Sequence, residues 1–456
     1  MKIALVRPNY NSHIITPPLG LGYLSSYLKS KDINTVIIDG LKDKLSPESL
    51  IKKILSINPD AVGITCLTAF YHQTVELSKL LKKSGLRVIL GGVHPTFLPY
   101  QTLVDSRADY VICGEGEISF FKLLKNNFIN NNIAGVYSRD NLKDSNQPII
   151  KSEIIENLDD LPFPDWQQID PNIYPRAPHG ALAKNFPIGI IMTSRGCPYE
   201  CIFCSSPKFY DRKIRFRSPE NVIKEIEYLI NNFKVKEIHF EDDNLTLVRD
   251  RVEKLTKLII DKNLKITWAC PNGIRADKVD RKLIKLMAKS GCYRFVYGIE
   301  SANPEILKRI KKRETISQIE EAIKIADEEG ISCQGFFIFG LPGETEATIE
   351  ESIKFAKKSK LSGAQFCILD ILPGSELWET LKDKFKPNWS KNSFKEPEWI
   401  PQGLSKEKIM VAQAKAFRQF YWRPRIIIKI IKLINFKQLT YLFKRIKDYR
   451  FLSNNT

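Results

Sequence analysis

The 456-residue sequence has no run of about eighteen uninterrupted apolar residues, so it predicts no helix that spans a membrane. Its N-terminus, MKIALVRPNY, also lacks the long apolar segment of a secretory signal. The nine cysteines are odd in number and lack the spacing of a disulfide framework. Together these absences predict a protein of the reducing cytoplasm, where clustered cysteines bind metals more often than they form disulfides.

The composition argues against intrinsic disorder and leaves the charge as the unusual feature. Hydrophobic residues make up 43% of the chain and charged residues 27%, as in ordinary folded proteins. The length is too great for one core, which predicts at least two domains. A formal net charge of +18 favours phosphate, nucleic acid or anionic lipid as partners, but it indicates nothing about the fold.

Short β-branched runs alternate with helical patterns in the first part of the chain. The predicted strands are Ile3–Arg7, Thr35–Asp39, Ala61–Thr65, Arg87–Leu90 and Tyr110–Cys113. The predicted helices between them are Leu21–Lys29, Pro47–Ser56 and Thr74–Lys83. This alternation predicts a parallel sheet with helices on both faces, whose ligand lies beyond the carboxyl ends of the strands.

From about residue 138 to residue 187 prolines crowd the sequence, which predicts a linker, and the alternation then resumes. The predicted strands are Ile188–Thr193, Glu237–Glu241, Ile266–Ala269, Arg294–Gly298, Cys333–Phe339 and Ala364–Ile371. The predicted helices are Pro219–Asn231, Arg249–Asp261, Asp280–Lys289, Ser317–Glu329 and Glu346–Lys358. Six such units predict a partial (β/α)6 barrel. The α/β chain therefore divides into a Rossmann-like domain (1–140), a linker (141–187), the partial barrel (188–385) and a helical basic extension (386–456).

Cys197, Cys201 and Cys204 follow the first strand of the second domain with the spacing Cys-x3-Cys-x2-Cys. Three thiolates on one loop can bind three irons of a [4Fe–4S] cluster and leave the fourth iron open. An open iron can chelate S-adenosylmethionine (SAM), and electron transfer into the sulfonium then breaks a carbon–sulfur bond. The alternatives are three unrelated thiols or a structural zinc site, which needs a fourth ligand that is not nearby. We take the three cysteines as the catalytic, metal-binding residues.

With this triad the sequence resembles the radical SAM superfamily, and within it the class B methylase-like members that carry an N-terminal cobalamin (B12)-binding domain. The likeness covers roughly residues 1 to 385. Pro17–Leu24 is similar to the segment that opens the first helix of the cobalamin domain. The stretch Asp159–Asp165 is similar to the linker of the family into its barrel.

The resemblance implies cobalamin contacts at the strand ends of the first domain, and one departure from related domains. The implied contacts are Thr65, Gly91, Gly92, His94, Gly114, Glu115 and Gly116. Other cobalamin domains place a histidine below cobalt in an Asp-x-His-x-x-Gly motif, whereas this chain has Asp39–Asp43 there, without histidine. The lower face of cobalt is therefore expected to be open or to meet another residue, for which the loop Cys66–His72 is the expected place.

The resemblance also implies SAM contacts at the strand ends of the barrel. Asp242 and Asp243 resemble the second-strand motif that contacts the methionine amino group, although such residues also cap helices. Arg275 could pair with the methionine carboxylate, with a surface salt bridge as the alternative. The remaining implied contacts are Glu300 and Ser301 for the ribose or methionine, Gly340 on the adenine side, and Pro373 at the end of the sixth strand.

The activity that the resemblance implies is methylation of an unactivated carbon in a small-molecule or lipid-like substrate. One SAM supplies a 5′-deoxyadenosyl radical, methylcobalamin donates the methyl group, and a second SAM restores it. The resemblance also implies an external one-electron donor such as flavodoxin or ferredoxin. The alternatives are a radical cyclase or oxidoreductase without net methyl transfer, and a non-catalytic cobalamin or SAM sensor. RNA methylthiolation, and with it nucleic acid, is not expected, because only Cys66 and Cys113 could serve a further cluster in the first domain.

The basic tail from Arg423 to Arg450 has two interpretations. Arg425, Lys429 and Lys432 fall on one helical face, and isoleucines occupy the other. One interpretation is an amphipathic helix on the inner face of a membrane, which would place the protein in the cytoplasm with a peripheral membrane contact. The other is a terminal helix packed on the barrel with a solvated basic face.

Overall fold

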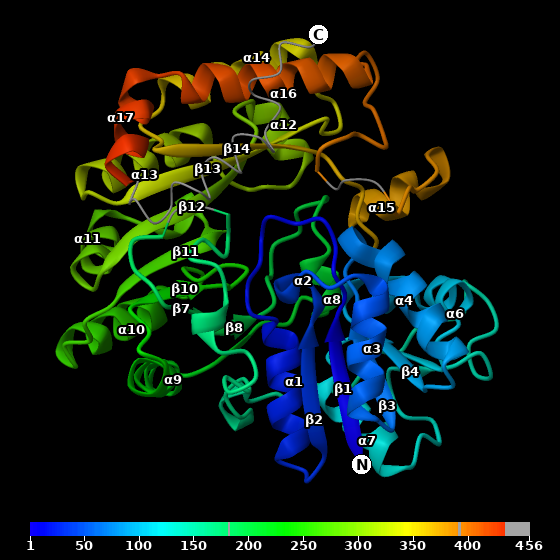
Figure 1. Cartoon of the computed structure of the whole chain (residues 1–456). Helices are drawn as coiled ribbons and strands as arrows, with labels where there is room; N and C mark the ends of the chain where they lie inside the picture. The colour runs from blue at the N-terminus through cyan, green and yellow to red at the C-terminus, as the bar shows by residue number, and fades with distance from the viewer. Residues whose placement is uncertain (181–182, 391–393, 434–456) are drawn as a thin grey trace.

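A computed structural model describes residues 1–180, 183–390 and 394–433 (Figure 1). The first domain contains a six-stranded sheet of order β2-β1-β3-β4-β5-β6, parallel except for the β5–β6 pair. Its strands are β1 (Lys2–Arg7), β2 (Asn34–Asp39), β3 (Ala61–Thr65), β4 (Val88–Gly91), β5 (Tyr110–Ile112) and β6 (Val136–Tyr137). Its helices are α1 (Leu19–Lys29), α2 (Gly40–Asp43), α3 (Pro47–Ile57), α4 (Tyr71–Lys83), α5 (Val93–Phe97), α6 (Pro99–Ser106) and α7 (Glu117–Lys125), with the 3-10 turn η1 (Thr68–Phe70).

Alternating side chains give this sheet a separate core on each face. On β1, Ala4 and Val6 pack with residues of α3, α4 and α6, whereas Ile3 and Leu5 pack with residues of α1 and α7. This is the period of two that a strand buried on both faces requires. Because the strand order reverses between β1 and β3, the carboxyl ends of these strands form the topological switch point where such sheets bind ligands.

The second domain is an open barrel of six parallel strands, with β7 and β14 as its edges. Its strands are β7 (Ile188–Ile191), β10 (Glu237–Phe240), β11 (Thr267–Ile274), β12 (Cys292–Glu300), β13 (Ser332–Phe339) and β14 (Gly363–Ile368). Its helices are α9 (Pro219–Phe233), α10 (Arg249–Asp261), α11 (Arg281–Lys289), α12 (Pro304–Arg309), α13 (Ile316–Glu328) and α14 (Glu346–Lys358). A two-stranded ribbon of β8 (Ser194–Arg195) and β9 (Arg215–Phe216), with α8 (Ser206–Phe209), follows β7. Further turns are η2 (Leu158–Asp160), η3 (Pro171–Ile173), η4 (Ala276–Lys278) and η5 (Lys382–Lys384).

The fold class predicted from the sequence is confirmed, whereas the domain boundaries stay predictions. The main difference is β11, which continues to Ile274 instead of ending at Ala269. Its pairing with β12 shifts register between Cys270 and Ile274, and Gly273 has φ +114. A bulge at this glycine lets the strand pass Pro271, which a regular strand would not tolerate.

The linker is ordered by contacts with both domains. Trp166 is buried and its Nε1 donates a hydrogen bond to Glu225 of α9 at 2.9 Å. Tyr174 donates from its hydroxyl to Asp39 at the end of β2, also at 2.9 Å. Since Leu161, Trp166 and Ile169 of the linker belong to the barrel core, this part of the linker is a packed element rather than a flexible spacer.

After α15 (Glu376–Leu381), the C-terminal extension packs against the barrel through α16 (Lys406–Tyr421) and α17 (Pro424–Leu433). Ser405 caps α16, because its hydroxyl accepts from the backbone of Lys408. Arg425 pairs with Asp327 of α13, so one cation of the predicted basic face is bound to the barrel. The rest of the predicted tail, residues 434–456, lies outside the described residues. Among the helices that are described, none is long and apolar enough to cross a membrane.

The backbone conformation at Gly92, which follows β4, predicts that any side chain at this position would destabilise the fold. It has φ +113 and ψ −168, a conformation open essentially to glycine, and a Cβ would lie 2.6 Å from the Cys66 carbonyl oxygen. We expect Gly92→Ala to lower the free energy of unfolding by about 3 kcal/mol or more, measured by denaturant titration. Gly85→Ala is the matched control, since Gly85 also has positive φ but has open space around it. We expect it to cost about 1 kcal/mol, and equal losses would contradict the steric argument.

Candidate active site

The loop that carries the cysteine triad is held at its entry by a glycine. Gly196 has φ +98, and a Cβ there would collide with the carbonyl oxygen of Lys213 in the turn before β9. The backbone of Cys204 donates to Cys201 at 3.0 Å, and that of Ile202 donates to Ile310 at 3.2 Å. The loop is therefore a folded turn tied to the end of α12.

The three thiols lie close enough to influence one another but are not arranged around a single ion. Burial raises the pKa of all three, that of Cys204 to about 12. Within the described part of the chain, no group of three or more His, Cys, Asp or Glu is placed to bind one metal ion. A cubane needs a wider spacing, since each thiolate binds its own iron. Three thiols on one loop are the donor set that a cubane with one open iron would use.

The second-strand motif is bound to the triad loop. Asp242 is buried and accepts from the Thr193 backbone at 3.2 Å and from the Thr193 hydroxyl at 2.6 Å. Asp243 accepts from the Ser206 hydroxyl at 2.6 Å, and burial raises its pKa. Asn244 has a buried amide nitrogen for which no described residue serves as acceptor. Asp242 therefore supports the loop, while Asn244 offers a donor to a ligand.

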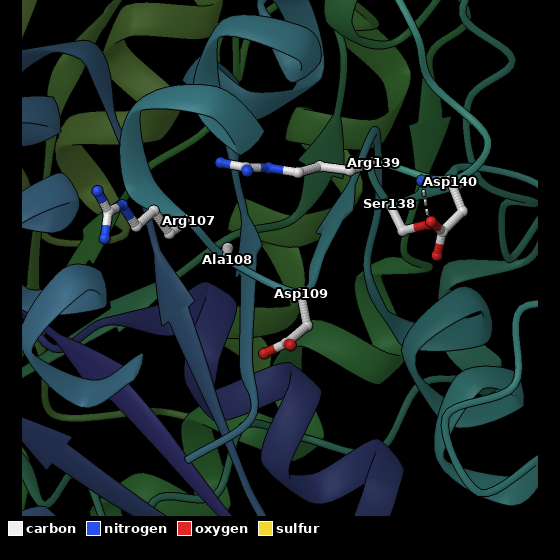
Figure 2. A pocket seen from close by; sticks show the side chains of 6 residues that line it. All are labelled: Arg107, Ala108, Asp109, Ser138, Arg139 and Asp140. Atoms are coloured by element: carbon white, nitrogen blue, oxygen red, sulfur yellow. Dashed lines mark hydrogen bonds between the residues drawn. The ribbon is translucent and has the colours of Figure 1, made fainter. Parts of the chain in front are cut away.

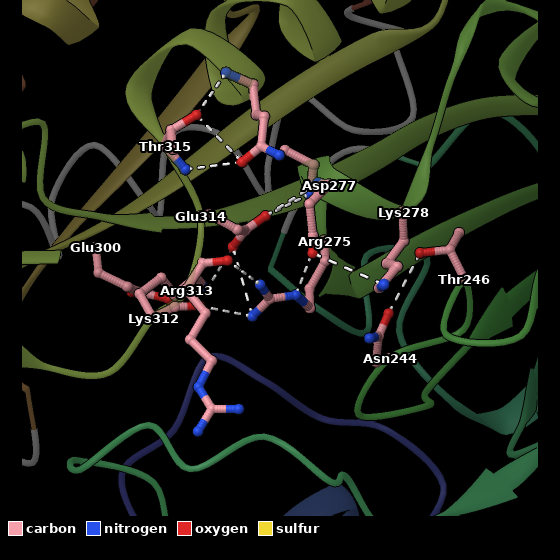
Figure 3. Close-up of polar contacts among 12 residues, drawn as sticks. Asn244, Thr246, Arg275, Asp277, Lys278, Glu300, Lys312, Arg313, Glu314 and Thr315 are labelled. Carbon is pink, nitrogen blue, oxygen red and sulfur yellow. Dashed lines mark hydrogen bonds and ion pairs between the residues drawn. The ribbon is translucent and has the colours of Figure 1, made fainter. Parts of the chain in front are cut away.

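Arg275 is occupied by protein groups (Figure 3). Its Nε donates to Asp277 at 2.8 Å, and its two other nitrogens donate to the carbonyl oxygens of Lys312 and Arg313 at 2.9 and 3.1 Å. Its guanidinium also lies 3.7 Å from the ring centre of Tyr199, inside the triad loop. The contact with the methionine carboxylate stays a prediction, and in this structure Arg275 holds the triad loop against the segment that follows α12.

Lys312 is a candidate residue that the sequence did not reveal. Its Nζ lies 3.0 Å from Glu300 and 3.5 Å from Glu314, and its side chain is 8% exposed. A Cβ on Gly298 would lie 2.9 Å from this Nζ, so only glycine leaves room for the pair. Glu300 itself has φ +64, a strained conformation typical of functional sites. In the sequence Lys312 stands in the run Lys-Lys-Arg, which looks like a solvated basic face.

The other predicted SAM contacts lie at the same end of the barrel but are held by the fold. Ser301 is buried, and its hydroxyl accepts from the backbone of Asn303 before α12. The Gly340 backbone donates to Glu344 at 2.7 Å. Pro373 is buried in the loop after β14, next to Gly374, which packs on the ring of Phe97 in the first domain. These placements leave the three SAM contacts as predictions.

The predicted cobalamin contacts at the ends of β3 and β4 and after β5 form one edge of the first domain. Thr65 pairs with Gly91, and Gly91 pairs with Ile112. A Cβ on Gly91 or on Gly116 would meet nothing closer than 3.9 Å, whereas Gly114 packs against Lys151. The edge therefore has side-chain-free places where a flat ligand can approach the backbone, as a corrin ring requires.

His94 is the exception at this edge, because it lies fully buried. Its ring stacks on Tyr71 at 3.9 Å and meets the edge of Trp389 at 5.0 Å. Its Nδ1 is 3.2 Å from the Thr68 hydroxyl, and its Nε2 has no hydrogen-bond partner among the described residues. Burial lowers its pKa to about 3, so the ring is neutral. A cobalamin contact through His94 stays a prediction.

Glu115 lies in a buried ion cluster that joins the two domains. It pairs with both Arg195 and Arg215, and Glu117 pairs with Arg195 at 2.8 Å. None of the four side chains is more than 8% exposed. Since Arg195 directly precedes Gly196, this cluster ties the loop after β5 to the triad loop, and the ligand edges of the two domains face each other.

A polar hollow lies away from this edge, at the amino end of β5 (Figure 2). It is lined by Arg107, Ala108, Asp109, Ser138, Arg139 and Asp140. Asp109 is bound by Lys82, and Arg139 donates to backbone carbonyls of α6. We assign no function to it.

Comparison with known proteins agrees with this arrangement. The sequence model of the radical SAM superfamily matches residues 191–356, and that of the B12 binding domain matches residues 11–124. An uncharacterized methyltransferase of Pyrococcus horikoshii is 35% identical over 94% of this chain and 95% of its own length. Cytidylyl-2-hydroxyethylphosphonate methyltransferase of Streptomyces wedmorensis is 30% identical over 79% of this chain and 77% of its own. Anaerobic magnesium-protoporphyrin IX monomethyl ester cyclase of Rubrivivax gelatinosus is 29% identical over 92% and 77%.

Solved structures share the two-domain fold. The cobalamin-dependent enzyme OxsB with aqua-cobalamin bound superposes with a TM-score of 0.74, at 19% identity over 98% of this chain and 71% of its own. TsrM of Kitasatospora setae, with cobalamin and a [4Fe–4S] cluster bound, gives 0.69 at 18% identity over 92% and 85%.

A radical SAM barrel preceded by a B12-binding domain is the class of enzyme that this fold and this site define. The chain belongs to the radical SAM superfamily, among its cobalamin-dependent members. Its cofactors are a [4Fe–4S] cluster, SAM and cobalamin.

The ion cluster predicts that Glu115→Gln weakens the junction between the domains. The change leaves Arg195 and Arg215 buried with one carboxylate fewer, and breaking such a pair costs about 3 kcal/mol or more. We expect that loss in denaturant unfolding, together with faster proteolysis of the linker. Glu153→Gln is the matched control, because Glu153 is 52% exposed and its one ion pair with a described residue is with Lys122. A loss no larger than that of the control would contradict this role.

The same cluster should depend on pH through Glu117. Burial alone would raise its pKa, but the Arg195 guanidinium, a backbone hydrogen bond and Arg215 together outweigh burial and lower the pKa. The stability that Glu117 contributes is therefore present at neutral pH and is lost as the pH falls through this lowered value. We expect Glu117→Gln to flatten the acid limb of stability plotted against pH.

Proposed function

We propose that this chain is a cobalamin-dependent radical SAM C-methyltransferase for a small-molecule or lipid-like substrate. The observation that carries the proposal is that the glycine edge after β4 and β5 and the triad loop after β7 face each other through the Glu115–Arg195 pair. A methyl donor and a hydrogen-abstracting radical must reach the same carbon, so their sites must share one space. The cofactors supply the chemistry: SAM and the cluster provide the radical, and cobalamin provides the methyl group.

The residues of the chain hold and orient these groups. Cys197, Cys201 and Cys204 would bind the cluster. Asp243 and the orphaned amide of Asn244 would meet the methionine part of SAM beside it. Gly91 and Gly116 would let the corrin approach the backbone. Trp389 packs over Tyr71 and His94 beside this edge.

The relatives support methyl transfer more directly than the alternative. Two of those described above are named as methyltransferases, and the third is a cyclase that is 29% identical over 92% of this chain. The cyclase similarity keeps radical oxidation without net methyl transfer as the second candidate. Incorporation of label from methyl-deuterated SAM into a product separates the two activities.

The partners of the reaction are part of the proposal. An external one-electron donor such as flavodoxin or ferredoxin would reduce the cluster, because no described residue can supply electrons repeatedly. We do not propose nucleic acid as a substrate. A membrane contact through the tail is compatible with the exposed Ile427 and Ile428 at the start of α17.

The proposal predicts that cluster binding and SAM cleavage depend on the triad. After anaerobic reconstitution with iron, sulfide and hydroxocobalamin, wild-type protein should contain about four irons and form 5′-deoxyadenosine with a strong reductant. The triple variant Cys197→Ala, Cys201→Ala, Cys204→Ala should retain cobalamin but lose the cluster absorbance and all deoxyadenosine. Cys292→Ala, at the opposite end of the barrel, is the control and should behave as wild type. Zinc in place of iron, or cleavage by the triple variant, would contradict the assignment.

The charges near Cys201 predict which ligand the site prefers. Three carboxylates, those of Asp277, Glu300 and Glu314, surround the two cations Arg275 and Lys312. This excess favours SAM, whose sulfonium gives it one positive charge more than S-adenosylhomocysteine.

We therefore expect Glu300→Gln to weaken SAM binding on the order of tenfold while changing S-adenosylhomocysteine binding much less, as measured by calorimetry on the reconstituted enzyme. The isosteric amide can still accept from Lys312 and keeps the same backbone freedom. The control is Glu376→Gln, which removes an exposed carboxylate paired with Lys311. Equal weakening for both ligands would show that Glu300 does not act through charge.

A further inference from the structure

A chain of hydrogen bonds inside the barrel has no part in the site described so far. Glu237, His239 and Glu241 alternate along β10 and at its end, so their side chains share one face. His179 of the linker joins them: its Nδ1 lies 2.9 Å from Nδ1 of His239, and its Nε2 lies 2.7 Å from Oε1 of Glu241. His239 completes the chain through Nε2, 2.7 Å from Oε1 of Glu237.

Glu237 and His239 form the buried inner end of this hydrogen-bond chain, and their surroundings determine the protonation state of each. Glu237 and His239 have no exposed surface. Glu237 accepts from the Tyr293 hydroxyl at 2.6 Å and from the Asn185 backbone at 2.7 Å. Burial would raise the pKa of Glu237, but its hydrogen bond with His239 and further donors lower it, so it is a carboxylate. Burial lowers the pKa of His239 to about 4, so His239 is neutral.

The donors and acceptors along this hydrogen-bond chain can be assigned in turn, and one proton remains that His179 and Glu241 must share. Because Glu237 only accepts, Nε2 of His239 carries its proton, and Nδ1 of the neutral ring is an acceptor. Nδ1 of His179 must then be the donor between the two histidines. The remaining contact, from Nε2 of His179 to Glu241, needs one proton, which lies either on the imidazole or on the carboxyl group.

The outer end of the chain opens toward the cluster side of the barrel. The Glu241 side chain is 21% exposed, against 9% for His179. Among the described residues, none donates a hydrogen bond to Oε2 of Glu241. Glu241 directly follows the last residue of β10, so it lies at the carboxyl end of the barrel strands, the end at which the triad loop follows β7. The charged and titratable groups facing the histidines from other elements are Tyr293 and Arg294 of β12.

We propose that Glu241 and His179 form an acid–base site for a hydroxyl or ammonium group of the substrate. The site accepts a hydrogen bond at Oε2 of Glu241 and takes the proton when the neighbouring carbon reacts. The O–H or N–H bond breaks and leaves its electron pair on the substrate. The proton adds to Oε2, and the shared proton then rests on Nε2 of His179, so the pair ends as a neutral carboxyl group beside an imidazolium, one proton more than it held before. The proton returns when the product forms, so neither an oxidant nor a net proton is needed.

The role of Glu241 and His179 in turnover rests on the proposed function. The proton that they share depends only on the hydrogen bonds within the protein. The test of the shared proton is nitrogen-15 NMR on full-length reconstituted enzyme, labelled in its five histidines and kept in its oxidised, diamagnetic state. We expect a strongly deshielded proton on the His179–Glu241 contact and a protonated Nδ1 on His179 between pH 6 and 8. Glu241→Gln should abolish the deshielded resonance. Glu253→Gln, on α10 and 17% exposed, should leave it unchanged.

The test of the ligand class uses ethanolamine, which carries both a hydroxyl and an ammonium group, with acetate as the negative probe. We expect ethanolamine but not acetate to shift the His179 resonances in wild type and in Glu253→Gln. Loss of that response in Glu241→Gln supports the site, and should this variant fold poorly, the wild-type titrations decide alone. Absence of the shared proton, or no response to ethanolamine, overturns the proposal. If both responses appear while the enzyme makes no deoxyadenosine, the proposed function fails and this site stands.

Discussion

The ion cluster of Glu115, Glu117, Arg195 and Arg215 is the constraint on which the rest of the site depends. Buried charges are costly unless each has a partner, and here each partner comes from the other domain. The cluster therefore cannot form until the two domains are docked. Once it has formed, it keeps the domains from sliding past each other. Because Arg195 leads into the triad loop, the cluster also joins that loop to the first domain.

Three glycines also shape the site, because each lies where a side chain would collide with a neighbouring group. Gly92 and Gly196 sit where a Cβ would strike a carbonyl oxygen, and Gly298 sits where it would strike the Glu300–Lys312 pair. Each glycine lets two chain segments approach more closely than any other residue would allow. The shape of the ligand edges in both domains therefore depends on the absence of a Cβ at these glycines as well as on the side chains present.

The sequence predicted the elements that short local patterns specify. It missed the contacts between residues that lie far apart along the chain. The strands and the amphipathic helices follow from periodicity within short windows, and the fold class was correct. The role of the triad, which rests on spacing, stays a prediction. β8 and β9 were missed because two-residue strands carry no periodicity. Glu115 lies 80 residues from Arg195 and 100 from Arg215, so nothing local could show that its carboxylate is bound by two guanidiniums.

The net charge of +18 shows how composition and site electrostatics can diverge. On composition alone, such a charge favours anionic partners at the working surface. Yet four buried cations at the described domain junction and beside the triad loop, Arg195, Arg215, Arg275 and Lys312, are each paired with buried carboxylates. A site whose own balance is acidic is suited to a sulfonium, and this is consistent with a small cationic cofactor rather than a polyanion at the barrel mouth.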